Sequence, residues 1–231
     1  MSISCPSAQP SKCTLRPRLR SVLTHTMTRA RSNLLLSLAA ALALTGPSFA
    51  QGLPDWPPGR LLAALSGDWN ANGEADLAVL VADDEGEVDL LIHEGGFADM
   101  TVALRVPGVI FHGGMGGGRP QLIARSETSF ALHQEWLGIG RTPWTRTLTV
   151  AYRGGDYVLA GFTHAFADRL DPERSGLCDV NLLSGRWEGD FTPATGQPTR
   201  NRSGTDGPRA FPLSELTEDY FPPVCRDLFA E

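Results

Sequence analysis

Residues 67–77 have the sequence Gly67-Asp68-Trp69-Asn70-Ala71-Asn72-Gly73-Glu74-Ala75-Asp76-Leu77. Asp68, Asn70 and Asn72 carry side-chain oxygens at alternate positions, a glycine follows, and Asp76 adds a carboxylate at the ninth position counted from Asp68. Oxygen ligands at these intervals, with a glycine for the sharp turn, are typical of a loop around a hard cation such as calcium. Glu74, at the seventh position, would contribute its backbone carbonyl. The stretch therefore predicts a calcium-binding loop with ligands from Asp68, Asn70, Asn72, Glu74 and Asp76.

The predicted role of this ion is structural. The twelfth position is Val79, so the bidentate glutamate of an EF-hand is missing, and the apolar run Leu77–Ala82 predicts a strand where an EF-hand has a helix. Only two ligands carry formal charge, which predicts a modest dissociation constant of about 10⁻⁴–10⁻³ M. The alternative is an empty turn, rich in Asp and Asn, that caps a hairpin.

The same residues resemble the Asp-x-Asn-x-Asn-Gly-x-x-Asp-Leu loop of FG-GAP/VCBS-type repeats, which occur in β-propellers and in many exported bacterial proteins. The resemblance implies a calcium ion in a loop at the start of a strand. One such loop is present, whereas a propeller requires several repeats, so the resemblance does not extend to a propeller.

A second resemblance covers more of the chain. Residues 144–147, 152–162 and 178–186 are similar to the second half of small, uncharacterised exported proteobacterial proteins that also carry an Asp/Asn/Gly loop near their start. This resemblance implies a periplasmic or secreted protein and implies no reaction.

Residues 1–50 have the features of a secretory signal with an upstream extension. Two arginines precede the apolar run Leu34–Leu44, and Ser48-Phe49-Ala50 places small residues where signal peptidase recognises them. We expect cleavage before Gln51 and a true start at Met27. The apolar run is about half of the ~20 residues needed to span a bilayer, so we expect no transmembrane anchor in the mature protein.

The mature chain is strongly acidic. Six of the 20 basic residues lie in the first 50, which contain no acidic residue, so 14 basic groups remain against 26 acidic ones, a net charge near −12. This balance disfavours nucleic acid as a partner and suits cations. The length remaining is enough for a single domain with a substantial core.

Two cysteines follow the signal region, Cys178 and Cys225. In an exported chain the simplest prediction is a disulfide between them. A redox-active pair is the alternative, but the chain has nothing like a Cys-x-x-Cys motif.

Alternating strand-like segments and turns follow the predicted calcium loop. Leu77–Ala82 and Val88–His93 flank the turn Asp83-Asp84-Glu85-Gly86 and predict a hairpin. Further hairpins are predicted at 121–136, 144–162 and 177–191, and no segment shows sustained helical periodicity. We therefore expect an all-β fold of mainly antiparallel hairpins in one domain, 51–231, with little helix outside the signal peptide.

The composition changes at residues 192–208, which are rich in Pro, Gly, Thr and Asn and predict a long loop. The tail beyond this loop contains Cys225, so the predicted disulfide would tether the tail to the strand region at Cys178.

No catalytic constellation stands out. His93, His112, His133 and His164 are widely separated, and the glycine run after His112 has no accompanying nucleophile motif. We expect a non-catalytic exported domain that binds an unknown protein or envelope component. A secreted hydrolase with a histidine or carboxylate cleft is one alternative. A carbohydrate-binding module that uses Trp136, Trp144 and Trp187 is another.

Overall fold

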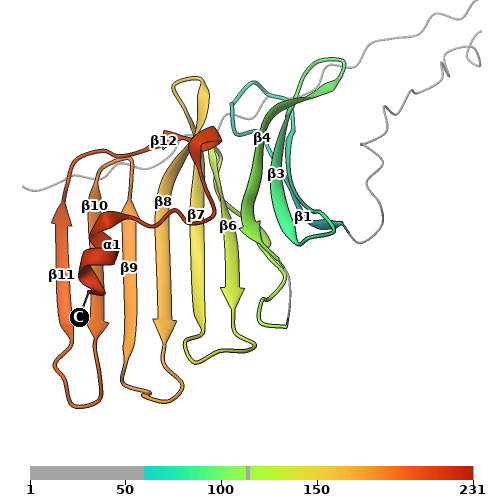
Figure 1. Cartoon of the computed structure of the whole chain (residues 1–231). Helices are drawn as coiled ribbons and strands as arrows, with labels where there is room; N and C mark the ends of the chain where they lie inside the picture. The colour runs from blue at the N-terminus through green and yellow to red at the C-terminus, as the bar shows by residue number, and fades with distance from the viewer. Residues whose placement is uncertain (1–59, 113–114, 231) are drawn as a thin grey trace, which may run out of the picture. The chain divides into compact units, whose positions relative to one another are not determined.

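The structure is a computed structural model that describes residues 60–112 and 115–230, which belong to one compact unit, Gln51–Glu231. The signal-peptide prediction concerns residues outside this part of the chain. The described residues form an all-β fold with very little helix, as the sequence predicts (Figure 1). Within the same residues, the structure contains no helix with the length and apolarity needed to cross a membrane.

The first sheet contains four antiparallel strands in the order β1-β2-β3-β4. Their bounds are β1 Leu61–Gly67, β2 Asp76–Ala82, β3 Glu87–Gly95 and β4 Met100–Phe111. The predicted apolar run lies in β2, where Ala78, Val79 and Leu80 are each at most 1% exposed. β4 is a single strand with an irregularity around Pro107-Gly108, which β4 tolerates because it forms an edge of the sheet.

The second sheet is an antiparallel meander in the order β5-β6-β7-β8-β9-β10-β11, and the short β12 pairs with β8. Its strands are β5 Gln121–Ser126, β6 Ser129–Trp136, β7 Trp144–Arg153, β8 Asp156–Ala167, β9 Ser175–Asn181, β10 Arg186–Thr192, β11 Arg200–Thr205 and β12 Phe211–Pro212.

The loop predicted at 192–208 is wrong over part of its length, because Arg200–Thr205 forms β11. Phe191 pairs with Arg200 and Arg186 with Thr205, so the whole of β11 is matched against β10. Backbone pairing to an existing strand compensates for the weak strand propensity of Asn, Ser and Gly in this segment.

The two sheets share one hydrophobic core. Leu132, Leu148, Phe162 and Val180 form one cross-strand row on the inner face of the second sheet, and each is at most 5% exposed. From the β1–β2 loop, Trp69 reaches this core and packs on Phe130 with ring centroids 4.6 Å apart. The β1–β2 loop is therefore anchored in the interior at its second residue.

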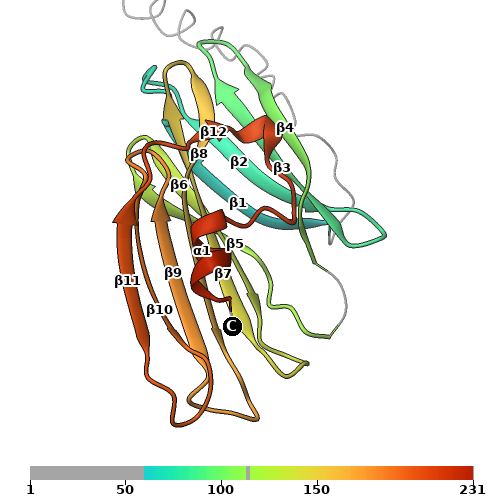
Figure 2. The same ribbon diagram turned by 60° about the vertical axis from the view of Figure 1, so that its left-hand side comes forward.

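The C-terminal tail covers part of the inner face of the second sheet (Figure 2). It contains the short 3₁₀ helix η1, Leu213–Glu215, and the helix α1, Pro223–Leu228. The predicted disulfide is present and joins Cys178 on β9 to Cys225 in α1, with Cα atoms 5.6 Å apart. The tail packs closely because Gly189 has no side chain, since a Cβ there would lie 2.6 Å from a methyl carbon of Leu228.

Candidate functional site

The predicted calcium loop connects the end of β1 to the start of β2 and is organised around the Asp68 carboxylate. One Asp68 oxygen accepts the backbone N–H of Asn72, and the other accepts that of Gly73, both at 3.0 Å. Gly73 has φ of +89°, a conformation that favours glycine, and Ala71 also lies in the left-handed region at 57°. The backbone therefore coils around the side chain at the first ligand position.

The two asparagines continue this arrangement. Asn70 Oδ1 accepts the N–H of Asn72 at 3.1 Å, and Asn72 Oδ1 accepts the N–H of Glu74 at 2.7 Å. Asn72 Nδ2 donates to the carbonyl of Gly95 at 3.0 Å, which ties the loop to the end of β3. The three oxygen-bearing side chains at alternate positions are thus each hydrogen-bonded to the loop's own backbone.

Asp76 occupies a different environment, because it is 0% exposed at the start of β2. Its carboxylate accepts the N–H of Trp69 at 2.8 Å and the N–H of Gly95 at 3.1 Å. Asp76 and Glu94 lie close enough to Tyr157 on β8 that their charges, added to the larger effect of burial, raise the pKa of its phenol. Asp76 therefore joins the end of the loop to its start at Trp69 and to the end of β3 at Gly95, and it faces the second sheet.

The donor set of the loop contains only oxygen. In the described part of the chain, no three Asp, Glu, His or Cys side chains gather around a point where a metal could bind. The loop instead offers two carboxylates, two amide oxygens and the Glu74 carbonyl. A carboxylate or amide oxygen that accepts one N–H keeps lone pairs for a cation. All-oxygen sites of this kind fit calcium better than zinc.

The histidines lie in separate environments. His93 is buried on β3, where burial lowers its pKa. His133 lies on the opposite face of the second sheet from the core, with Nδ1 2.9 Å from Thr147 Oγ1. His164 faces inward, where burial and, secondarily, the charge of Arg146 lower its pKa to about 4. These histidines are not part of any group of three or more His, Cys, Asp or Glu side chains that could hold a metal within residues 60–112 and 115–230.

The three candidate sugar-stacking tryptophans also belong to packed surroundings. Trp136 and Trp144 are directly paired between β6 and β7 on the same face as the core row. Trp136 packs so closely on the glycine run that a Cβ at Gly116 would lie 2.1 Å from its ring. Trp187 is partly buried and packs against the hydrophobic core. These side chains are used in packing, and they do not form an exposed stacking platform.

A polar row on the outer face of the second sheet was not visible in the sequence. It crosses seven strands in register, through Gln121, His133, Thr147, Thr163, Asp179, Glu188 and Ser203. Thr163 Oγ1 donates to Asp179 at 2.7 Å. An open hollow beside this row is lined by Asp179, Glu188 and Asp190, among others. The row depends on the register in which the strands pair, and the alternation of apolar and polar residues in the sequence does not determine that register.

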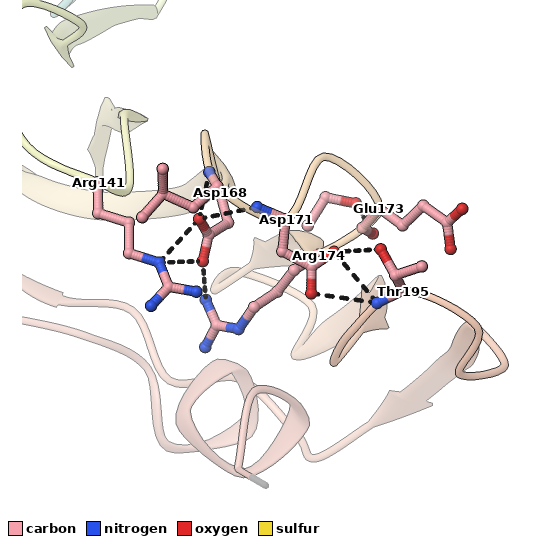
Figure 3. Close-up of polar contacts among 8 residues, drawn as sticks. Arg141, Asp168, Asp171, Glu173, Arg174 and Thr195 are labelled. Atoms are coloured by element: carbon pink, nitrogen blue, oxygen red, sulfur yellow. Dashed lines mark hydrogen bonds and ion pairs between the residues drawn. The ribbon is translucent and has the colours of Figure 1, made fainter.

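A second organised region lies where three hairpin loops end the sheet: 137–143, 168–174 and 193–199, here called the loop end (Figure 1). Figure 3 shows its polar contacts, in which Arg141 Nε donates to both oxygens of the Asp168 carboxylate at 2.9 and 2.7 Å. The Asp168 side chain is 1% exposed and lies 4.0 Å from Arg174 Nη1. The hydrogen bond from Arg141 is the main cause that holds the pKa of Asp168 below its usual value.

The third loop joins this network through Thr195. Its hydroxyl donates to the Asp171 carboxylate at 2.5 Å, and its N–H lies 3.1 Å from each oxygen of the same group. These bonds hold the pKa of Asp171 below its ordinary value. Glu173 accepts the N–H of Gly196 at 2.8 Å. Ion pairs and hydrogen bonds therefore connect all three loops.

Comparisons with known protein families, with curated proteins and with solved structures found no match.

Proposed function

We propose that this protein is an exported, non-catalytic β-domain that binds a partner of the cell envelope and that holds one structural calcium ion in its Asp68–Asp76 loop. The observation that carries the calcium proposal is the arrangement of the Asp68 carboxylate, around which the N–H groups of Asn72 and Gly73 are gathered at 3.0 Å. Asp68, Asn70, Asn72 and Asp76 would supply side-chain oxygens, and Glu74 its carbonyl.

The contribution of the ion would be mechanical. Asp76 already joins the loop to β3 through Gly95, and Trp69 joins it to the core at Phe130. A cation bound between these anchors would cross-link the ends of β1 and β2. A resident calcium ion would supply charge compensation and rigidity, and no reaction step.

Export is supported by two independent features. The arrangement of Leu34–Leu44 before small residues is typical of a signal peptide. The Cys178–Cys225 disulfide suits an oxidising compartment such as the periplasm or the extracellular medium. N-terminal sequencing of protein recovered from periplasm and medium tests this part, and the expected first residue is Gln51.

Thermal unfolding with and without calcium tests the central part of the proposal. At 10 mM calcium, a dissociation constant near 10⁻³ M stabilises the folded state by about 1.4 kcal/mol. For a chain of this size that is a rise in Tm of roughly 3–5 °C.

Two variants make the test specific. Asp68→Ala should abolish the calcium-dependent rise, whereas Glu74→Ala should retain it, because Glu74 is proposed to act through its carbonyl. Magnesium should give a smaller rise, since it demands a stricter octahedral geometry. A Tm that millimolar calcium leaves unmoved would show that the loop is an empty turn.

A further inference from the structure

Four apolar side chains protrude at or beside the loop end: three lie on its loops 137–143 and 168–174, and Met115 lies on the neighbouring segment that precedes β5. The exposed fractions are 84% for Met115, 46% for Leu137, 52% for Ile139 and 77% for Leu170, and these four residues are here called the apolar tips. They lie on adjacent segments, because the N–H of Gly138 donates to the carbonyl of Gly116 at 2.7 Å and the N–H of Arg169 donates to that of Arg141 at 2.9 Å.

The backbone that carries the tips has its carbonyl groups satisfied within the protein. The Arg169 guanidinium donates to the carbonyls of Leu137, Gly138 and Gly140, at 3.1 Å for Gly138 and 2.9 Å for Gly140. Trp136 Nε1 donates to the carbonyl of Ile139 at 3.1 Å. The backbone N–H of Arg169 donates to the carbonyl of Arg141. Five consecutive carbonyls, from residue 137 to residue 141, therefore accept hydrogen bonds from within the protein.

This pattern is unusual for an exposed loop, whose carbonyls ordinarily bond to water. A loop that leaves water must have partners for its backbone groups, since each unsatisfied group in an apolar medium costs several kcal/mol. The segment 137–141 meets this condition for its carbonyls while it also presents aliphatic side chains outward. Its carbonyls would therefore not lose hydrogen bonds if the segment moved from water into an apolar environment.

The size of the apolar tips argues for a lipid surface over a stable protein interface. Their exposed fractions add up to about two and a half fully exposed side chains. Even at the 150–250 Å² that large aromatic side chains bury, this is roughly 400–650 Å². Stable protein interfaces bury about 800 Å² per partner. Membrane binding instead strengthens with the apolar area that is inserted, so an area of this size suits reversible, peripheral docking.

The local charge selects the kind of lipid. Loops 137–143 and 168–174 contain three arginines, Arg141, Arg169 and Arg174, and three acidic residues, Asp168, Asp171 and Glu173. The loops are thus locally neutral, on a mature chain with a strong overall negative charge. This balance fits zwitterionic headgroups and disfavours an anionic surface.

We propose that the loop end docks the protein peripherally on a zwitterionic lipid surface, with the apolar tips inserted below the headgroups. The proposal names a partner for the envelope-binding role and in that respect rests on the proposed function. It does not depend on the Asp68–Asp76 loop, which connects β1 to β2 in the first sheet.

Sedimentation with phosphatidylcholine vesicles tests the proposal, with exported protein of determined N-terminus. Wild type should bind equally at 0.1 and 1 M salt. Ile139→Ser/Leu170→Ser should lose about tenfold or more in vesicle partitioning, because two aliphatic side chains no longer leave water. Phe97→Ser is the matched control, since Phe97 is fully exposed in the β3–β4 turn, and it should bind as wild type does.

Arg169→Ala separates the role of the backbone from that of the tips. It keeps all four aliphatic side chains but removes the donors to three carbonyls, so vesicle binding should fall although the apolar surface is intact. Its Tm should be measured alongside, and a variant that unfolds is replaced by Arg169→Lys, which cannot donate to three carbonyls at once and should bind more weakly than wild type.

Several outcomes would overturn the proposal. These are no wild-type binding to the vesicles, equal binding by the double variant, an equal loss in Phe97→Ser, or binding that occurs only on anionic vesicles and disappears at 1 M salt. Sedimentation equilibrium that shows a dimer abolished by the double variant would instead assign the loop end to a second copy of the chain. None of these results tests calcium binding, which is tested by the Tm shift. Turnover of a substrate would contradict the proposed non-catalytic function but would not contradict lipid docking.

Discussion

The Asp68–Asp76 loop and the loop end are both fixed firmly, but by opposite means. In the first, the side-chain oxygens of Asp68, Asn70 and Asn72 accept hydrogen bonds from backbone groups two to five residues away. In the second, partners such as Arg141 and Asp168 are 27 residues apart in the chain and oppositely charged. The oxygens of the first loop keep lone pairs that could bind an ion. At the loop end, arginines and carboxylates such as Arg141 and Asp168 pair with each other, and apolar side chains are exposed. This difference is the basis of our two proposals, that a cation completes the first loop and that the second meets an apolar surface.

The largest effect is expected from the buried end of the first loop. Asp76→Ala would leave the N–H groups of Trp69 and Gly95 without an acceptor, at about 1–3 kcal/mol each, so the free energy of unfolding should fall by roughly 2–6 kcal/mol. Urea unfolding measures this change. Glu74→Ala, at an exposed position of the same loop, should change stability by less than about 0.5 kcal/mol. A loss below about 1 kcal/mol in Asp76→Ala would mean that the loop is not fastened through this carboxylate.

The partly buried histidine His164, which lies in neither loop, should make stability depend on pH. The pKa of His164 is lowered to about 4, so the folded protein resists a proton that the unfolded chain accepts near pH 6.5. Stability is therefore full above pH 6.5 and declines as the pH falls toward 4, by about 2–3 kcal/mol after allowance for partial exposure. In His164→Phe this decline should shrink, leaving the smaller part from His93, whose pKa shifts in the same direction. An unchanged decline in His164→Phe would contradict the assignment.

The loop end should respond to pH in a lower range. The pKa values of Asp168 and Asp171 are held below the ordinary aspartate value, so their contribution is complete above about pH 3.8 and is lost as the pH falls through the lowered values. Asp168→Asn should reproduce this loss at neutral pH as faster amide exchange in 137–143 and 168–174. Asp206→Asn is the control, because its 4.0 Å pair with Arg209 is more exposed and should matter little. Equal exchange in the two variants would mean that the Asp168 network does not hold the loops.

The sequence predicted what is encoded locally. Alternation and turn residues indicated the all-β fold and most hairpins, and the spacing of Asp68, Asn70 and Asn72 marked a loop whose side chains serve its own backbone. The two remaining cysteines were enough to predict the Cys178–Cys225 bridge. Whether the loop binds calcium, and whether the FG-GAP/VCBS likeness reflects ancestry, stay predictions.

The sequence did not show what depends on register and on distant partners. β11 has the composition of a loop and is a strand because β10 pairs with it along its full length. Arg141, Arg169 and Asp171 are ordinary charged residues in the sequence, and their partners lie 24 to 32 positions away. Only strand pairing brings these loops together, so the loop end and its apolar tips were invisible before the fold was known.

Amide exchange measured with and without 10 mM calcium tests the contrast between the two loops most directly. We expect slower exchange at Asn72, Gly73 and Glu74, whose N–H groups face the oxygens of the Asp68–Asp76 loop, and unchanged exchange in 137–143. In Asp68→Ala the calcium effect at Asn72, Gly73 and Glu74 should vanish, and exchange in 137–143 should again be unchanged by calcium. Unchanged exchange throughout the wild-type protein, or equal slowing in both loops, would contradict the claim that calcium completes one loop while the other is complete without it.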